Sequence, residues 1–114
     1  MTGTTPAGDA DDTFAVDVQH ETGASTARLR LEGELDTATV GELSAVLERV
    51  VANGATEVRI DMAAVPFMDS TGLTALIAAK GQLEGRGMVT VESASSAVRR
   101  TFEVAGLDAV FGTA

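Results

Sequence analysis

The side chains with the clearest chemical potential lie together, where an apolar pair is followed by a carboxylate and two hydroxyls. The segment is Phe67-Met68-Asp69-Ser70-Thr71-Gly72. Asp and Ser are among the residues that most often cap a helix N-terminus, where the side-chain oxygen accepts hydrogen bonds from free backbone N–H groups. Capping by Asp69 or Ser70 is the simplest role for this segment, and it predicts that a helix begins here.

A second role for Ser70 is that of a nucleophile, which requires a general base within hydrogen-bond reach. The sequence offers only His20, the single histidine, or the adjacent Asp69. Side chains of neighbouring residues at a helix start diverge, and the Gly-x-Ser-x-Gly pattern of a nucleophile elbow is absent. We therefore expect no catalytic residue and no enzymatic activity.

A third role for Ser70 is that of a phosphate acceptor. A phosphoryl group adds about −1.5 to −2 charge units and three acceptor oxygens. The dipole and the free N–H groups at a helix N-terminus tolerate such a group, so the domain need not refold. Asp69 would repel the phosphate, and a partner packed on Phe67 and Met68 would have to desolvate it. Phosphorylation would then switch binding without changing the fold.

The composition excludes several other kinds of site. The 114 residues carry 17 acidic and 8 basic side chains, a net charge of −9, which argues against binding to nucleic acid or to an anionic membrane. No apolar stretch approaches the roughly 20 residues that span a bilayer. The absence of cysteine, the lone histidine and the absence of a Gly-rich phosphate loop argue against a metal site or a nucleotide cofactor. We expect a small cytoplasmic domain with no metal site and no cofactor.

Hydrophobic periodicity predicts the elements that position this segment. Alternating apolar residues predict strands at 14–18, 27–31, 58–62 and 88–92, the first two paired as an antiparallel hairpin through a turn at 21–24. Helical spacing predicts helices over 40–50, from Asp69 or Ser70 to about Leu83, and from Ser95 or Ser96 to about Ala105, with a short final strand at 110–111. This order indicates one α/β domain: a mostly parallel sheet of four to five strands, an N-terminal β-hairpin and about three helices.

The predicted elements also assign expected roles to individual residues and to the N-terminal segment. Asp36 or Thr39 is expected to cap the first helix, and Gly72 is expected to let the backbone of a partner approach closely. Residues 1–12 are acidic and aperiodic, which predicts a disordered tail before a domain at 13–114. The second helix is expected to carry Leu73, Leu76, Ile77 and Lys80 along one side, and the third is expected to carry Val98, Phe102 and Ala105 on its inner face.

Four segments together resemble one bacterial family. Residues 67–73 are similar to the phosphorylation loop of the anti-sigma factor antagonists, which are single STAS domains. Gly33-Glu34-Leu35-Asp36 resembles the end of the family's second strand, and Gly87-Met88-Val89 resembles its fourth-strand entry. Residues 96–100, with Phe102 and Gly106-Leu107, resemble its third helix and exit. The likeness runs from about Thr13 to Phe111, so the chain is identified as a member of this family.

The resemblance implies a phosphorylation switch. In the family, the serine after the loop aspartate, here Ser70, is phosphorylated by the anti-sigma factor, itself a serine kinase; Thr71 is not the main acceptor. The unphosphorylated antagonist binds the anti-sigma factor and frees the sigma factor, and a PP2C-type phosphatase restores that form. The acidic chain suits a basic partner surface. The expected docking surface comprises Asp36, Phe67, Met68, Asp69, Ser70, Thr71, Leu73 and Thr74.

Two features leave alternatives open. A STAS domain can also be a docking subunit of a transporter or of a stress-signalling complex, which predicts constitutive binding that Ser70→Asp does not affect. The chain ends at Ala114, whereas many relatives continue through a further helix. The alternatives are a less covered sheet edge at that point or a truncated chain, and weak self-association is expected in either case.

Overall fold

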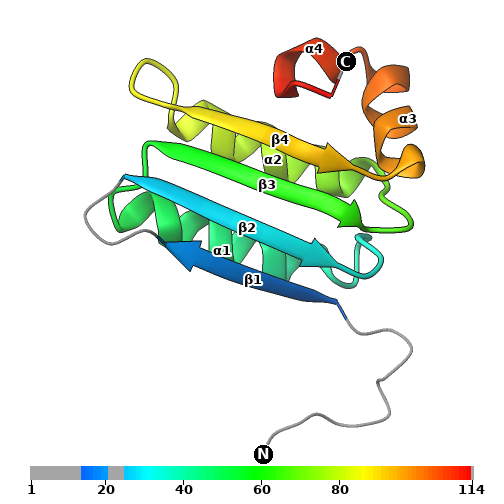
Figure 1. The fold of residues 1–114 in the computed structure, drawn as a ribbon, viewed down its shortest axis with the longest axis horizontal. Helices are drawn as coiled ribbons and strands as arrows, with labels where there is room; N and C mark the ends of the chain where they lie inside the picture. Colours follow the sequence, from blue (N-terminus) through cyan, green and yellow to red (C-terminus); the bar gives the residue numbers. More distant parts are fainter. Residues whose placement is uncertain (1–13, 21–24, 114) are drawn as a thin grey trace, which may run out of the picture.

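Four strands lie side by side in the order β1-β2-β3-β4 (Figure 1). The computed structural model describes residues 14–20 and 25–113, so the expected tail at 1–12 and turn at 21–24 lie outside the described residues. The strands are β1 (Ala15–His20), β2 (Thr26–Glu32), β3 (Glu57–Ala64) and β4 (Met88–Ala94). Strand β1 pairs antiparallel with β2, and β2, β3 and β4 run parallel. The predicted hairpin and the mostly parallel sheet are confirmed.

Two helices cover one face of this sheet, and two more lie beyond its β4 edge (Figure 1). The covering helices are α1 (Val40–Ala52) and α2 (Ser70–Gln82), and the others are α3 (Ser96–Ala105) and the one-turn α4 (Asp108–Phe111). Gly106 ends α3 with a left-handed φ of 74°, a conformation that glycine adopts without steric cost. In the described part of the chain, none of the helices is long and apolar enough to cross a bilayer.

The alternation within each strand decides which sheet face the helices cover. In β2, Ala27, Leu29 and Leu31 are fully buried beneath α1 and α2, whereas Arg28 and Arg30 point to solvent. On the open face Arg28 and Arg59 are directly opposite one another, and Glu92 bonds to both at 3.1 and 3.3 Å. One carboxylate thus offsets the repulsion between two neighbouring guanidinium groups.

The predicted final strand at 110–111 is wrong, because these residues belong to α4. The ring of Phe111 packs on that of Phe102 with centroids 5.4 Å apart, while Val110 is exposed. A single helical turn places one of two adjacent apolar residues against the core. A two-residue strand beside β4 would form only a few backbone hydrogen bonds.

The single side expected for Leu73, Leu76, Ile77 and Lys80 on α2 and the inner face expected for α3 are each confirmed only in part, and Lys80 is half-buried. Leu73, Leu76, Val98 and Phe102 are buried, but Ile77 is 48% exposed and Ala105 also faces solvent. The buried side of α2 also includes the small residues Gly72, Ala75 and Ala79. When a helix packs against the core through small residues, some of its larger apolar side chains face solvent. The spacing of the large residues alone does not show which face is buried.

Candidate functional site

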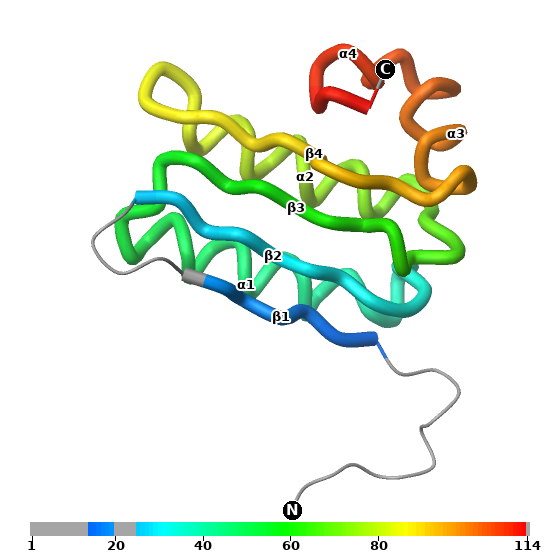
Figure 2. The backbone as a smooth tube through the Cα atoms, viewed as in Figure 1, coloured from blue at the N-terminus to red at the C-terminus, as the bar shows by residue number. Residues whose placement is uncertain are grey.

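The candidate site lies where the parallel strands end at their carboxyl termini. The loops after β2 and β3 turn at the same edge of the sheet (Figure 2). Leu35 N–H donates to the Phe67 carbonyl at 2.9 Å, and Asp69 N–H donates to the Leu35 carbonyl at 3.1 Å. These bonds tie the two loops into a short parallel bridge. In open α/β sheets, ligands bind at the carboxyl ends of the strands.

Asp69 caps α2 and binds only the second of the two hydroxyls that follow it. Its Oδ1 accepts hydrogen bonds from the Thr71 N–H at 2.9 Å and from the Thr71 hydroxyl. The Ser70 side chain is exposed, and its hydroxyl has no hydrogen bond to the described part of the chain. The predicted cap is therefore confirmed as Asp69, and of the two hydroxyls Ser70 is the accessible one.

This geometry predicts that Asp69→Ala lowers the free energy of unfolding by about 1 kcal/mol, the usual cost of losing an N-cap side chain. Asp69→Asn is the matched control, because an amide oxygen at the same position still accepts from Thr71. Urea denaturation of the three proteins measures the difference. Equal midpoints for the Ala and Asn variants would contradict the capping role.

Asp36 lies in the loop bridged to this segment, and it caps the turn that precedes α1. Its Oδ1 accepts from the N–H groups of Ala38 at 2.9 Å and Thr39 at 3.2 Å. Thr39 is the N-cap residue by position, but its side chain makes no capping bond to α1 and donates to the Glu34 carbonyl at 2.8 Å. Of the two expected caps, Asp36 supplies the side-chain bonds. Its half-buried carboxylate lies on the same loop edge as Asp69.

The apolar pair before Asp69 divides between surface and core. Phe67 is 48% exposed, whereas Met68 is only 2% exposed. Leu73, expected on the docking surface, is also buried. The expectation of two exposed apolar side chains is therefore correct for Phe67 and wrong for Met68. The bridge between Met68 and Leu35 explains the difference, because it turns Met68 toward the core.

Exposed side chains continue from Ser70 along α2. Thr74 and Ile77 follow Ser70 at spacings of four and three residues, which places the three side chains on one helix face. Thr74 is exposed, and its hydroxyl donates to the Ser70 carbonyl at 3.0 Å. Sequence spacing places Ile77 on the same side of the helix as Leu73 and Leu76, but those two are buried and Ile77 is exposed. The weak apolar periodicity of a helix rich in alanine and glycine was the available signal that its large side chains do not define one inner face.

Gly72 has a different role from the one expected. A Cβ atom there would lie 2.8 Å from the side chains of both Leu35 and Met68. The missing side chain therefore lets α2 approach the bridged loops within the domain. The expectation that a partner requires this glycine is replaced by an internal packing reason.

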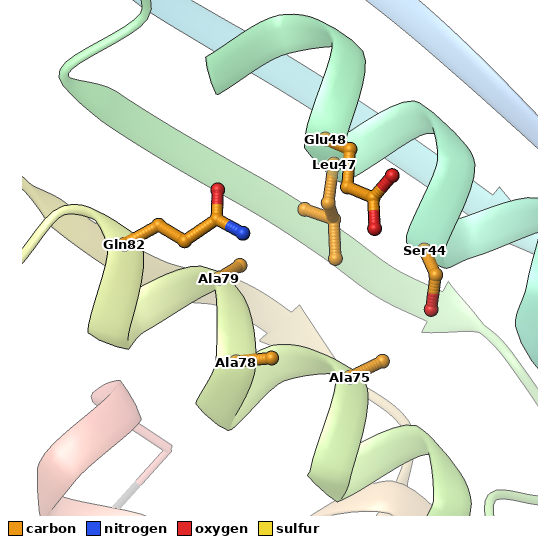
Figure 3. Close-up of a pocket in the computed structure, with 7 residues that line it drawn as sticks. All are labelled: Ser44, Leu47, Glu48, Ala75, Ala78, Ala79 and Gln82. Atoms are coloured by element: carbon orange, nitrogen blue, oxygen red, sulfur yellow. The ribbon is translucent and has the colours of Figure 1, made fainter. Parts of the chain in front are cut away.

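A pocket between α1 and α2 is too small to be a cofactor site. Its volume is about 40 Å³, against roughly 300–1,000 Å³ for small-molecule sites. In Figure 3, Ala75, Ala78 and Ala79 of α2 face Leu47 of α1 across it. The pocket is a gap left by alanine packing.

Comparisons with known proteins agree with this fold. A family model described as "Mlab, STAS domain" matches residues 18–112. The anti-sigma-F factor antagonist RsfB of Mycobacterium tuberculosis is 32% identical over 102 residues, which cover 90% of this chain and 82% of RsfB. A crystal structure of an anti-sigma factor antagonist from Mycobacterium paratuberculosis matches with a TM-score of 0.78 and 30% identity, covering 88% of this chain and 84% of that one.

The anti-sigma factor antagonist SpoIIAA is similar in two forms. Its unphosphorylated form matches with a TM-score of 0.72 and 29% identity over 82% of each chain. The phosphorylated form, from Bacillus, matches with a TM-score of 0.64 and 26% identity over 83% of this chain and 86% of that one. The family model and these relatives span nearly all of the described chain, which therefore belongs to the STAS-domain family of anti-sigma factor antagonists.

Proposed function

We propose that this antagonist binds an anti-sigma factor that is also a serine kinase, and that phosphorylation of Ser70 ends the binding. The unphosphorylated chain sequesters the anti-sigma factor in the cytoplasm and frees the sigma factor. A PP2C-type phosphatase returns the chain to the binding form. In this cycle the chain is a partner and a substrate, with no catalytic residue of its own.

The observation that carries the proposal is the contrast between the two adjacent hydroxyls. Ser70 presents an exposed hydroxyl at the first position of α2, whereas the Thr71 hydroxyl is half-buried and donates to Asp69. A kinase needs a hydroxyl that reaches the γ-phosphate without first breaking the helix cap. Ser70 meets that requirement, and the resemblance of SpoIIAA, solved in a phosphorylated form, supports a phosphoacceptor in this family.

The docking surface that we propose surrounds Ser70 at the carboxyl edge of the sheet. Met68 and Leu73 support it from beneath, because both are buried. Phe67 and Ile77 are its two exposed apolar side chains, one before Ser70 and one along α2. The surface comprises Asp36, Phe67, Asp69, Ser70, Thr71, Thr74 and Ile77.

The charge of this surface selects the kind of partner. Asp36 and Asp69 are its charged members, and both carboxylates have backbone N–H groups as hydrogen-bond donors rather than lysine or arginine side chains. A partner with basic side chains around an apolar centre matches it, since complementary charge speeds encounter and fixes orientation. Phosphate at Ser70 would add negative charge at the centre of this surface, opposite the apolar part of the partner, where no basic side chain compensates it.

The test is phosphorylation by the cognate anti-sigma factor with ATP, followed by intact mass measurement and peptide mapping. We expect one phosphoryl group, on Ser70, and none on Ser70→Ala. Thr71→Val is the matched control, because it removes the neighbouring hydroxyl and is expected to be phosphorylated. Phosphate on Ser70→Ala at the normal rate, or an unmodified wild-type chain, would overturn the proposal.

A further inference from the structure

The β3–α2 loop, residues 65–69, is held by two side chains, those of Ser95 at the start of α3 and Thr101 within it. The Ser95 hydroxyl, which also caps α3, donates to the Val65 carbonyl at 2.6 Å. The Thr101 hydroxyl donates across 33 residues of sequence to the Met68 carbonyl at 3.2 Å. The loop that presents Ser70 is therefore anchored to α3 as well as to the β2–α1 loop.

The peptide unit between Met68 and Asp69 is held at both of its polar ends. Its carbonyl accepts from Thr101 on α3, and its N–H donates to the Leu35 carbonyl in the β2–α1 loop at 3.1 Å. Because a peptide unit is planar, two anchors on opposite sides fix its orientation. Asp69, the next residue, caps α2, and Ser70 follows directly, so this orientation determines where the Ser70 hydroxyl lies.

The Thr101 hydroxyl has one proton and two acceptors within reach. The Ala97 carbonyl in its own helix lies at 3.1 Å, close to the distance of the Met68 carbonyl. Met68 is buried. Among the backbone hydrogen bonds of the turns and loops in the described residues, none has the Met68 carbonyl as acceptor. A buried carbonyl without a donor is costly, so the bond to Met68 has the larger effect on folding.

We infer that Thr101 is a positioning residue for Ser70: its hydroxyl holds the Met68–Asp69 peptide in the orientation that presents the phosphoacceptor. The inference rests on the proposed function for its biological meaning, while its structural part stands on the hydrogen bonds alone. Helix α3 thereby contributes to a switch whose exposed residues all lie on other elements.

The first test measures amide hydrogen exchange by NMR in Thr101→Val, which keeps the side-chain shape and removes the donor. We expect the amides of Leu35, Asp69 and Thr71 to exchange about tenfold faster, the effect of one lost hydrogen bond to a buried acceptor. The amides of Thr56 and Met88, bonded at the opposite end of the sheet, serve as the internal reference and are expected to keep their rates.

Two further variants separate positioning from general destabilisation. Thr101→Ser retains a hydroxyl and is expected to restore slow exchange at the loop. Thr26→Val removes another half-buried hydroxyl, bonded to Glu57 at 3.3 Å, and is expected to leave the loop amides unchanged. Equal acceleration of loop and reference amides in Thr101→Val, or a serine variant that behaves like valine, would overturn the inference.

The second test is steady-state phosphorylation of Ser70 by the cognate anti-sigma factor. We expect Thr101→Val to raise KM about tenfold and Thr101→Ser to restore it, because a displaced loop docks less well. Unchanged KM with faster local exchange would overturn the positioning role in the switch. If the wild-type chain is not phosphorylated at all, the proposed function fails, and the exchange experiment still decides whether Thr101 positions the loop.

Discussion

The variant Ser70→Asp is expected to bind the anti-sigma factor about 100-fold more weakly than the unmodified chain, and phosphorylated Ser70 is expected to bind at least as weakly. Complex formation on the docking surface would remove the new charge from water beside Phe67. An uncompensated charge at an interface costs several kcal/mol, and about 3 kcal/mol corresponds to the expected loss. Titration calorimetry with the unmodified, substituted and phosphorylated chains measures it.

The same substitution is expected to leave folding nearly unchanged. Position 70 is the first residue of α2, where the helix dipole favours a negative charge by about 0.3–1 kcal/mol, and repulsion from Asp69 opposes that gain. The exposed side chain displaces no packed neighbour. The melting temperature is therefore expected to stay close to that of the wild type while affinity falls.

Ser25→Asp is the matched control for charge, because Ser25 is also exposed but lies beside the start of β3, at the opposite end of the sheet. It adds the same charge and is expected to bind normally. If both variants weaken binding equally, general electrostatics rather than the position of Ser70 is responsible. If neither does, the chain docks constitutively, as a subunit of a larger complex would.

Most of the architecture follows from local patterns in the sequence. Alternation such as that of Leu29 and Leu31 with Arg28 and Arg30 specifies a strand buried on one face, and the observed burial matches it. Asp69 as N-cap and Gly106 as C-cap were predictable because their chemistry acts within one helical turn. The position of Ser70 at the start of a helix was predictable for the same reason.

The remainder depends on contacts between segments far apart in sequence. Met68 is buried because its backbone pairs with Leu35, and Thr101 reaches Met68 from a helix 33 residues away. Neither contact leaves a local pattern. For Ile77 the local pattern is present but misleading. Its hydrophobicity predicts burial, yet it is exposed, because small residues elsewhere on α2 pack against the core.

Gly87→Ala is expected to destabilise the domain by about 3 kcal/mol, the upper part of the range for forced overpacking. A Cβ atom at Gly87 would lie 1.9 Å from the backbone oxygen of Thr56. That oxygen also accepts the Met88 N–H at 2.9 Å, and the Thr56 N–H donates to the Ser25 carbonyl at 2.8 Å. Relief of the clash therefore requires backbone movement where β3 and β4 begin, and it weakens a bond between the two strands.

Gly81→Ala is the matched control, because Gly81 lies within α2 and a Cβ atom there meets nothing within 4 Å. Alanine in an open helical position is expected to stabilise the domain by about 0.5–1 kcal/mol. The two substitutions add the same methyl group, so opposite shifts in the urea midpoint isolate the contact with Thr56 from any general effect of replacing glycine. Many turn residues could end α2 before β4. Position 87, however, lies so close to the Thr56 backbone that only a residue without a Cβ atom fits there. A Gly87→Ala protein as stable as the wild type would show that the start of β4 can move away from Thr56 at little cost.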